Sequence, residues 1–481
     1  MTAKEWEAPA SFGQERIWLA DQMDPGSPVF NLQCPIEVPH AIGAEEIVAA
    51  LRAVTGRHEV LRTSLRVADG ALRQVVHAEA DPDVRVHDLR ALPPEERRTR
   101  ANERILADTK AAIPTGRAPL WRATLLRMED SRWLVSLVLH HAVFDAASSV
   151  ILAEEVTELC AAAAAGRPAE LPEPPVQYAD YAAWQRDRLT GRALAEQTGY
   201  WRSRLAGLPA VHTLPTDRPR PARLGYAGDE VRFTVPREVQ EQVAAVARRS
   251  AATPFMVYLT AYVVLLSRLS RDDDTVVGVT MSGRDLPEVA GLVGMFVNQM
   301  VVRTDTSGDP AFADLLGRVR ADLLDAMENG QIPFQAVVEA VAPQRDPGVQ
   351  PLYQLGFNYI PDSGIEPIPY VTSKDDLAFD LTTEVSRLLY RTDLFDRGTA
   401  ETFVGRYLRV LAAAVADPGT RIGGLPLLDE AERASLLEAG TPQPPLEHAT
   451  ALRMVEAQAA RTPHATAVIA GDRRLTYAEL D

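Results

Sequence analysis

A proline-dense stretch at residues 166–177, GRPAELPEPPVQ, divides the chain into two parts with similar patterning. Proline has no backbone N–H and interrupts helices and sheets, so we expect the chain to cross here from one lobe to another. Before the crossing, RWLVSLVLH (132–140) is apolar and β-rich, which is typical of a strand covered on both faces. Residues 147–165 then predict a helix that ends at Gly166.

The second part repeats this alternation of strands and helices. Residues 229–235 and 275–281 predict strands, and Thr253 with Pro254 predicts the N-cap and first position of the apolar helix between them. A chain of 481 residues is too long for one ordinary core. We therefore expect an α/β fold built from two lobes of similar construction.

The pattern changes once more near the C-terminus. Residues 438–450 contain the Pro-rich string TPQPPLEHAT and predict a linker. Residues 451–481 begin a new pattern that stops at Asp481 just as a helix starts, so we expect only the beginning of a further domain there. The predicted organisation is a first lobe at 1–175, a second lobe at 176–437, the linker and the truncated unit.

Charge and terminal patterns exclude several functional classes. A net charge of −16 and an isoelectric point near 5.1 disfavour nucleic-acid binding, which needs a basic face. The N-terminus lacks the apolar core of a signal peptide, and the longest apolar run, 255–266, is shorter than the ~20 residues that cross a bilayer. Two distant cysteines form no disulfide framework and have no metal-ligand spacing. We expect a cytoplasmic protein that binds no nucleic acid, membrane or metal.

The string LHHAVFDAASS (139–149) carries the residues best suited to chemistry. Histidine titrates near neutral pH, and a strand-to-helix junction holds a reactive side chain on rigid elements. Neighbouring strand residues point to opposite faces, so at most one of His140 and His141 meets a given substrate. Asp145 precedes the predicted helix and can cap it or hold the turn. From these residues alone an equal alternative is two ordinary strand-end histidines and a capping aspartate.

The segment HHAVFDA (140–146) resembles the HHxxxDG motif of condensation domains in nonribosomal peptide synthetases. Residues 8–437 are similar to that family through a series of segments in the family's order. These segments are SFGQERIWL (11–19), RHEVLRTSL (57–65), QYADYAAWQ (177–185), LPTDRPRP (214–221), VGMFVNQMVVR (293–303), IPFQAVVEAV (332–341), PLYQLGFNY (351–359) and YRTDLFD (390–396). The tail from Leu452, ending in LTYAELD, is similar to the start of an adenylation domain, and this order favours condensation over the related epimerisation domains.

The resemblance implies two chloramphenicol-acetyltransferase-like lobes in a V-shaped pseudodimer with a central tunnel. The phosphopantetheine arms of a donor and an acceptor peptidyl carrier protein would enter the tunnel from opposite sides. The implied reaction is acyl transfer, in which the amine of a carrier-bound aminoacyl thioester attacks a donor acyl or peptidyl thioester and forms an amide. The chain itself is expected to bind no cofactor, and an adenylation domain is the expected neighbour.

By motif match, His141 is the catalytic residue, which positions the acceptor amine, accepts its proton, or both. The resemblance also implies that Asp145 pairs with Arg62 of the second segment and so holds the loop. The other implied residues are the motif positions His140, Ala146 and Ser148 and the candidate tunnel-lining residues Asn298, Tyr353 and Gln354.

The sequence departs from the family pattern at a few positions. Ala146 stands where glycine is usual, and alanine adds a methyl group and restricts positive φ angles. Gly13 and Gln299 also replace more usual small or hydroxyl residues. The change at Ala146 is either a tolerated small residue or a sign of a narrowed tunnel and altered donor chemistry.

Three functions stay open at this point. The first, which we favour, is an active condensation enzyme. The second is a variant enzyme that acylates a first amino acid or modifies the donor residue, and the third is a catalytically silent platform that binds carriers. Only about ten residues precede the first motif, so with Met1 as the native start we expect an initiating, acyl-loading domain or a subunit fed in trans.

Overall fold

The computed structural model describes residues 5–341, 346–360, 372–439, 450–471 and 473–480. Its contacts divide the chain into two compact units, Met1–Leu427 and Leu428–Asp481. Residues 1–427 of the two predicted lobes fall in the first unit, and residues 428–437 of the predicted second lobe fall in the other.

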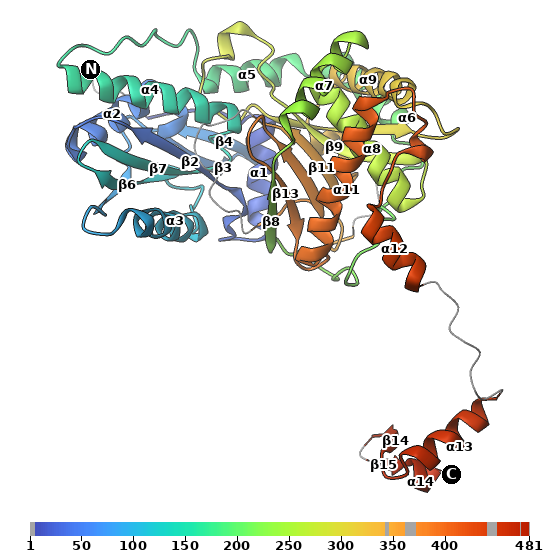
Figure 1. Cartoon of the computed structure of the whole chain (residues 1–481). Helices are drawn as coiled ribbons and strands as arrows, with labels where there is room; N and C mark the ends of the chain where they lie inside the picture. The colour runs from blue at the N-terminus through green and yellow to red at the C-terminus, as the bar shows by residue number, and fades with distance from the viewer. Residues whose placement is uncertain (1–4, 342–345, 361–371, 440–449, 472, 481) are drawn as a thin grey trace. The chain divides into compact units, whose positions relative to one another are not determined.

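The first part of the larger unit contains two sheets. Its elements are β1 Trp6–Pro9, α1 Phe12–Met23, η1 Pro28–Phe30, β2 Asn31–Val38, α2 Ala44–Arg57, η2 Glu59–Arg62, β3 Thr63–Ala68, β4 Ala71–Val76, β5 Asp83–Asp88, α3 Pro94–Lys110, β6 Trp121–Glu129, β7 Arg132–His140 and α4 Ala146–Ala165. One sheet has the order β2-β7-β6-β5 and the other the order β1-β4-β3. Figure 1 shows α2 and α4 on one face of the four-stranded sheet and α3 on the opposite face.

Burial on both faces explains the apolar sequence of β7. All of its residues from Trp133 to His140 are buried, and the strand is antiparallel to both neighbours, β2 and β6. The chain then turns into α4, whose N-cap is Asp145 and whose C-cap is Gly166 with a φ of 64°. Glycine adopts this left-handed conformation without the steric penalty of a Cβ atom. The strand and the end of the helix are confirmed as predicted, and the helix begins one residue earlier.

The second part of the unit contains one six-stranded sheet. Its elements are α5 Tyr178–Arg188, α6 Gly191–Arg204, β8 Gly228–Phe233, α7 Arg237–Arg249, α8 Pro254–Ser270, β9 Asp274–Met281, η3 Pro287–Val289, β10 Asn298–Asp305, α9 Phe312–Glu328, α10 Phe334–Val341, β11 Leu355–Tyr359, β12 Leu377–Leu381, β13 Ser386–Arg391, α11 Arg397–Ala416 and η4 Ile422–Gly424. The strand order is β10-β9-β11-β12-β13-β8, with β11 parallel to both of its neighbours.

Helix α8 forms the centre of the second core. It contacts α7, α9 and α11, and every residue from Met256 to Ser267 is buried. The Thr253 hydroxyl accepts a hydrogen bond from Met256 N and Pro254 opens the helix, which confirms the predicted start. Among the described residues, no single helix is long and apolar enough to cross a bilayer; α7 and α8 reach that length only together and are bent by 105°.

One segment of the second part packs inside the first. Val289, Leu292, Val293, Met295 and Phe296 belong to the same buried cluster as residues of β2, β7, α2 and α4. They lie between β9 and β10, and both of these strands belong to the six-stranded sheet of the second part. This crossing brings groups that are distant in sequence to the end of β7, where the candidate histidines lie.

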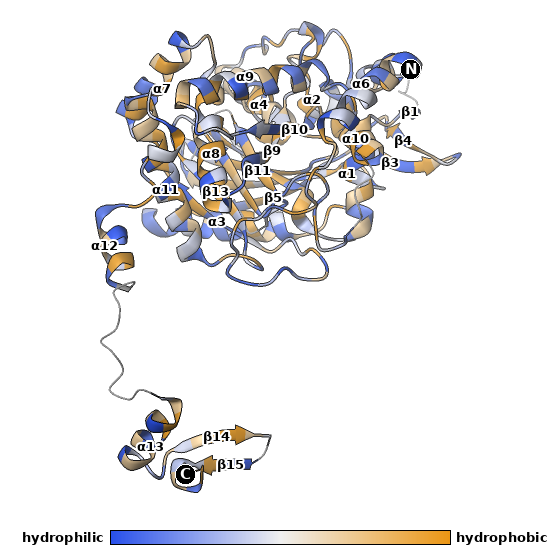
Figure 2. Cartoon of the chain, turned by 90° about the vertical axis from the view of Figure 1, so that its right-hand side faces the viewer, coloured by the Kyte–Doolittle hydropathy of each residue, from blue (hydrophilic) through white to orange (hydrophobic). Residues whose placement is uncertain are grey.

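The smaller unit has little buried surface of its own. Its elements are α12 Glu430–Ala439, α13 Ala451–Arg461, β14 Thr466–Ala470, β15 Arg473–Thr476 and α14 Tyr477–Leu480. The two strands form a hairpin, and Figure 2 shows apolar residues on it. Ile469 on β14 is 65% exposed. Among its described residues, Ala459 is the buried apolar residue.

Candidate active site

The two neighbouring histidines have different surroundings, as strand alternation predicts. His140 is 2% exposed, and its Nδ1 accepts a hydrogen bond of 3.2 Å from Ala142 N. Its Nε2 lies 3.8 Å from Asp21 Oδ1, which is longer than a hydrogen bond. His140 is therefore buried beside Phe30 and holds the turn that follows β7.

His141 is fixed through its backbone and through one ring nitrogen. Its N–H donates to Phe30 O at 2.7 Å, and its Nδ1 lies 2.7 Å from Phe144 O. A carbonyl oxygen only accepts hydrogen bonds, so Nδ1 carries the proton and the neutral ring keeps its lone pair on Nε2. The ring is thereby oriented with Nε2 as a hydrogen-bond acceptor.

The surroundings of His141 favour its neutral form. Burial lowers the pKa of His141 well below its usual 6.5, and the positive charges of Lys374 and Arg16 lower it further. The hydrogen bond to Phe144 O acts in the opposite direction but is weaker than burial. His141 therefore presents an unprotonated Nε2 at neutral pH, as required of a group that accepts a proton or a hydrogen bond.

Asp145 is the buried hub of the loop after β7. It is 0% exposed and accepts hydrogen bonds from Ser148 N at 2.8 Å, Phe296 N at 3.1 Å and Arg284 Nη2 at 2.9 Å. Arg284 also donates to the carbonyl oxygens of Val289 and Leu292. Asp145 thus caps α4 and at the same time fastens it to the crossing segment.

The predicted partner of Asp145 is wrong. Arg62 donates instead to Glu59 Oε1 at 3.0 Å and to His77 O, and the cation beside Asp145 is Arg284. Arg62 lies where η2 leads into β3, whereas Arg284 lies on the segment that crosses into the first core. Arg284 reaches Asp145 only because its segment packs into the first core in the folded chain. The order of the motifs in the sequence could therefore not identify Arg284 as the partner.

The other two motif positions, Ser148 and Ala146, belong to the first turn of α4. The Ser148 hydroxyl lies 2.7 Å from Asp145 Oδ1 and accepts from Gly294 N at 3.0 Å, so it joins α4 to the crossing segment. Ala146 is the first residue of α4 and is exposed. Ala146 is not among the non-glycine residues that have a positive φ in the described part of the chain. Glycine's conformational freedom is therefore not needed at this position.

Two departures from the family pattern lie where helix α1 meets the crossing segment and the start of β10. A Cβ atom on Gly13 would lie 3.1 Å from Met295 Sδ, so the first helix and the crossing segment meet closely there. Gln299 Oε1 accepts a hydrogen bond of 2.8 Å from Arg16 Nη1. Arg16, which the sequence did not single out, is one of the cations that act on His141.

The three candidate tunnel-lining residues have different positions. Asn298 Nδ2 donates to Gly330 O and Ile332 O at 2.9 and 2.7 Å, so this side chain holds the loop before α10. Gln354 is 4% exposed and bonds His212 N, Ala210 O and Gln350 O. Tyr353 and Gln354 line a small cavity that also includes Leu266 and Asp272, and His141 is not among its lining residues.

Among the described residues, no group of three or more histidine, cysteine, aspartate or glutamate side chains is placed to hold a metal ion. Both cysteines, Cys34 and Cys160, are free and buried, and burial raises the pKa of each thiol, to about 12 and about 11. Neither thiol is therefore prepared to act as a nucleophile near neutral pH.

Comparison with known proteins identifies the family. The sequence model of the family described as "Condensation domain" matches residues 4–437. The chain is 37% identical over 492 residues to phosphinothricin tripeptide synthetase PhsC of Streptomyces viridochromogenes, covering 98% of this chain and 45% of that protein. It is 37% identical over 500 residues to a probable non-canonical nonribosomal peptide synthetase, CymA, of Salinispora arenicola, covering 98% of this chain and 6% of that protein. The chain thus spans less than half the length of these relatives.

Solved structures agree with the sequence comparison. A four-domain nonribosomal peptide synthetase has a TM-score of 0.80 and 23% identity, covering 100% of this chain and 38% of the other. The X-domain from teicoplanin biosynthesis has a TM-score of 0.76 and 26% identity, covering 87% and 97%. The mixed α/β, chloramphenicol-acetyltransferase-like fold is confirmed by such neighbours. The relatives are nonribosomal peptide synthetases of secondary metabolism, and this chain belongs to the condensation domain family.

Proposed function

We propose that the chain forms an amide bond between two substrates held as thioesters on separate carrier proteins. The donor is an acyl or peptidyl group and the acceptor is an aminoacyl group, and each is attached to a phosphopantetheine arm. The observation that carries the proposal is the geometry of His141. Its Nδ1 donates a hydrogen bond to Phe144 O, and its Nε2 carries no proton at neutral pH.

The reaction needs a neutral amine close to the donor carbonyl. A new C–N bond forms as the acceptor amine attacks, and the C–S bond of the donor thioester breaks when the tetrahedral species collapses. An α-amine has a pKa of roughly 7.7–8.0, so the neutral form is accessible near physiological pH. His141 Nε2 receives a hydrogen bond from this amine, and the amine proton ends on the leaving thiolate, directly or through His141.

The two lobes and the tail support the choice of partners. We expect the lobes at 1–175 and 176–437 to form the sides of a V, with a donor and an acceptor peptidyl carrier protein delivering their arms to a tunnel between them. Holding two tethered reactants in one orientation supplies much of the rate of such a reaction. Residues 451–481, after the linker at 438–450, are the proposed start of an adenylation domain, and the whole enzyme acts in the cytoplasm.

A silent binding platform is the second candidate. Its support is the likeness to the X-domain, which one solved structure shows in complex with OxyB, at a TM-score of 0.77 and 25% identity. The described geometry of His141 and Asp145 favours the catalytic proposal, because a platform does not need an oriented, neutral imidazole. The alternative of an enzyme that modifies the donor residue rested on Ala146. It has less support, because Ala146 is exposed and has no positive φ.

The test is a coupling reaction followed by intact-protein mass spectrometry. A donor and an acceptor carrier are loaded with candidate acyl and aminoacyl groups, and amide formation is measured with wild-type protein, His141→Ala and His464→Ala. His464 is exposed in the smaller unit and serves as the matched control. We expect His141→Ala to lower the coupling rate by about 10²-fold or more, with His464→Ala unchanged.

Three results would contradict the proposal. Equal rates for wild type and a folded His141→Ala would remove His141 from the reaction. Binding of both carriers without any amide would favour the platform, and a mass change of the donor without coupling would favour the variant chemistry.

A further inference from the structure

Lys374 belongs to the second lobe and lies against a residue of the first. Its Nζ lies 5.0 Å from the centroid of the Phe30 ring, and Phe30 O accepts the hydrogen bond from His141 N. Within the described part of the chain, the Lys374 ammonium has no hydrogen bond or ion pair. A cation without a paired carboxylate therefore lies beside the residue that holds the His141 backbone.

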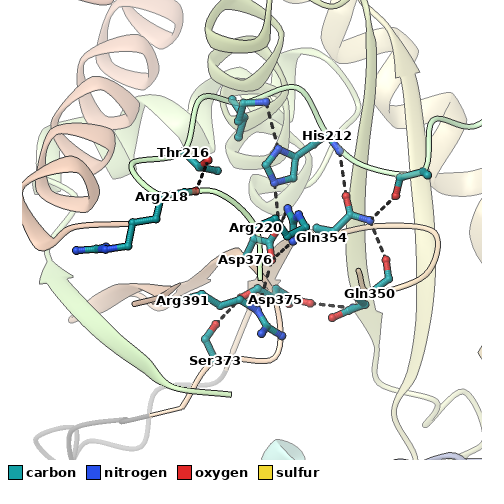
Figure 3. A network of polar contacts seen from close by, with 12 residues as sticks. His212, Thr216, Arg218, Arg220, Gln350, Gln354, Ser373, Asp375, Asp376 and Arg391 are labelled. Carbon is teal, nitrogen blue, oxygen red and sulfur yellow. Dashed lines mark hydrogen bonds and ion pairs between the residues drawn. The ribbon is translucent and has the colours of Figure 1, made fainter. Parts of the chain in front are cut away.

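A buried network fixes the segment that carries this lysine (Figure 3). Asp376 is 1% exposed and lies 3.0 Å from His212 Nε2, 3.2 Å from Arg220 Nη1 and 3.4 Å from Arg391 Nε. We call these four residues the Asp376 clamp. Arg391 Nη2 also donates to Lys374 O at 2.8 Å, so the clamp holds the lysine backbone directly.

The neighbouring carboxyl group does not neutralise Lys374 fully. Asp375 Oδ1 accepts from Gln350 Nε2 at 3.0 Å, and a Cβ atom on Gly356 would lie only 2.5 Å from Asp375 Oδ2. This close packing removes water, and burial raises the pKa of Asp375 to about 7. Near neutral pH the group is therefore only partly ionised.

A second cation, Arg16 on helix α1, also acts on the pKa of His141. Arg16 Nη1 donates to Gln299 Oε1 at 2.8 Å. Burial is the largest cause of the low pKa of His141, and Lys374, Arg16 and His140 all act in the same direction.

We propose that Lys374 is a positioning residue of the condensation reaction: the Asp376 clamp holds its backbone so that its ammonium lies against Phe30, where it opposes any second positive charge at His141 Nε2 and on the acceptor amine. The inference rests on the proposed amide-forming function. It predicts that His141 works as a hydrogen-bond acceptor for an amine that is already neutral. The proton of that amine then leaves with the donor thiolate rather than staying on the imidazole.

The Lys374 side chain is positively charged only below a certain pH. Burial and the nearby Arg16 lower the pKa of Lys374 to about 8, so the ammonium loses its proton as the pH rises above that value. The effect of Lys374 on coupling must therefore fade in alkaline solution. A purely structural lysine would affect the reaction equally at every pH.

The test compares Lys374→Met, which keeps the chain length without the charge, with Lys374→Arg, which keeps the charge. Lys110→Met is the matched control, because Lys110 is exposed at the end of α3. Single-turnover coupling of loaded carriers is measured from acid to alkaline pH, and the pKa of His141 is measured by NMR titration of ¹³C-histidine protein, with His141→Ala to assign the signal.

Lys374→Met is expected to raise the pKa of His141 and to move the acid limb of the rate profile to higher pH. On that limb the rate falls about threefold for each half unit of displacement, while rates above the pKa of Lys374 converge with wild type. Lys374→Arg is expected to restore the wild-type profile, and Lys110→Met to leave it unchanged.

Three results separate this inference from the proposed function. An unchanged His141 titration in a folded Lys374→Met overturns the inference even when coupling is intact. A rate loss that is the same at all pH values, or that Lys374→Arg does not rescue, also overturns it. A raised His141 pKa in a protein whose wild type forms no amide would support the electrostatic role of Lys374 and contradict the proposed function.

Discussion

Arg284 Nη2 lies 2.9 Å from Asp145 Oδ1, and this ion pair joins two positions that are 139 residues apart in the sequence. Both side chains are almost completely buried, at 8% and 0% exposure. The guanidinium also lies 4.2 Å over the Phe296 ring. The pair therefore fastens the crossing segment between β9 and β10 to the first turn of α4, shortly after the candidate catalytic histidine.

Removing Arg284 should destabilise the protein strongly. Arg284→Ala leaves the carboxylate of Asp145 buried without its cation, which costs about 3–5 kcal/mol in comparable buried pairs. Urea unfolding monitored by tryptophan fluorescence measures this change in the free energy of unfolding. Arg62→Ala is the comparison variant, since Arg62 contacts Glu59 and His77 O rather than Asp145. A larger loss for Arg62→Ala than for Arg284→Ala would reject the observed pairing.

Gly278 should not tolerate a side chain. A Cβ atom there would lie 2.1 Å from Tyr353 Cε2, within the ring of a residue that is 3% exposed. Gly278→Ala is therefore expected to reduce the free energy of unfolding by about 1–3 kcal/mol, as overpacked cores do. Gly317→Ala on α9 is the matched change, because the added Cβ meets no atom within 4 Å beyond its chain neighbours and its own helix backbone. Alanine also favours a helix by about 0.5–1 kcal/mol relative to glycine. Equal thermal stability of the two variants would contradict this packing.

Restoring the family glycine at Ala146 should change little. Ala146 is exposed at the first position of α4 and has no positive φ, so Ala146→Gly relieves no strain. We expect a loss of at most about 1 kcal/mol in stability from the lower helix propensity of glycine. The coupling rate and the mass of the product should match wild type. A changed product would instead show that the alanine methyl group selects the chemistry.

The sequence predicted those parts of the site that depend on local pattern. The apolar run before His140 gave the bounds of β7, because a strand covered on both faces must be apolar throughout. Asp145 was expected to cap the following helix, and its side chain accepts from Ser148 N. These features need only neighbouring residues, so they can be inferred without the fold.

Long-range partners could not be inferred in the same way. Among 50 lysine and arginine residues, nothing in the local pattern distinguishes Arg284 from Arg62 as the partner of Asp145. Lys374 and Asp375 were also missed, because consecutive charged residues usually mark a solvated loop. Both are half-buried, through contacts with Phe30, Gln350 and Gly356 that only the folded chain brings together.

Asp375 should give the protein a pH-dependent stability with a defined sign. Its pKa rises from the usual 3.8 to about 7 in the folded protein, with burial as the largest cause. Between these values the folded state holds a proton that the unfolded state has released, so this group's contribution to stability falls as the pH rises. The slope cannot exceed about 1.4 kcal/mol per pH unit for one proton.

Asp375→Asn removes this proton and keeps an oxygen that can accept from Gln350 Nε2. Relative to wild type, the variant should therefore gain stability from pH 4 to pH 7 and show a constant difference at higher pH. Urea midpoints measured for both proteins at pH 5 and pH 8 test the sign, and the difference cancels the titration of groups that the two proteins share. An equal difference between the variant and wild type at pH 5 and pH 8 would show that Asp375 is already ionised in the folded protein at pH 5. In that case the carboxylate would neutralise Lys374, and the unpaired cation beside His141 would disappear.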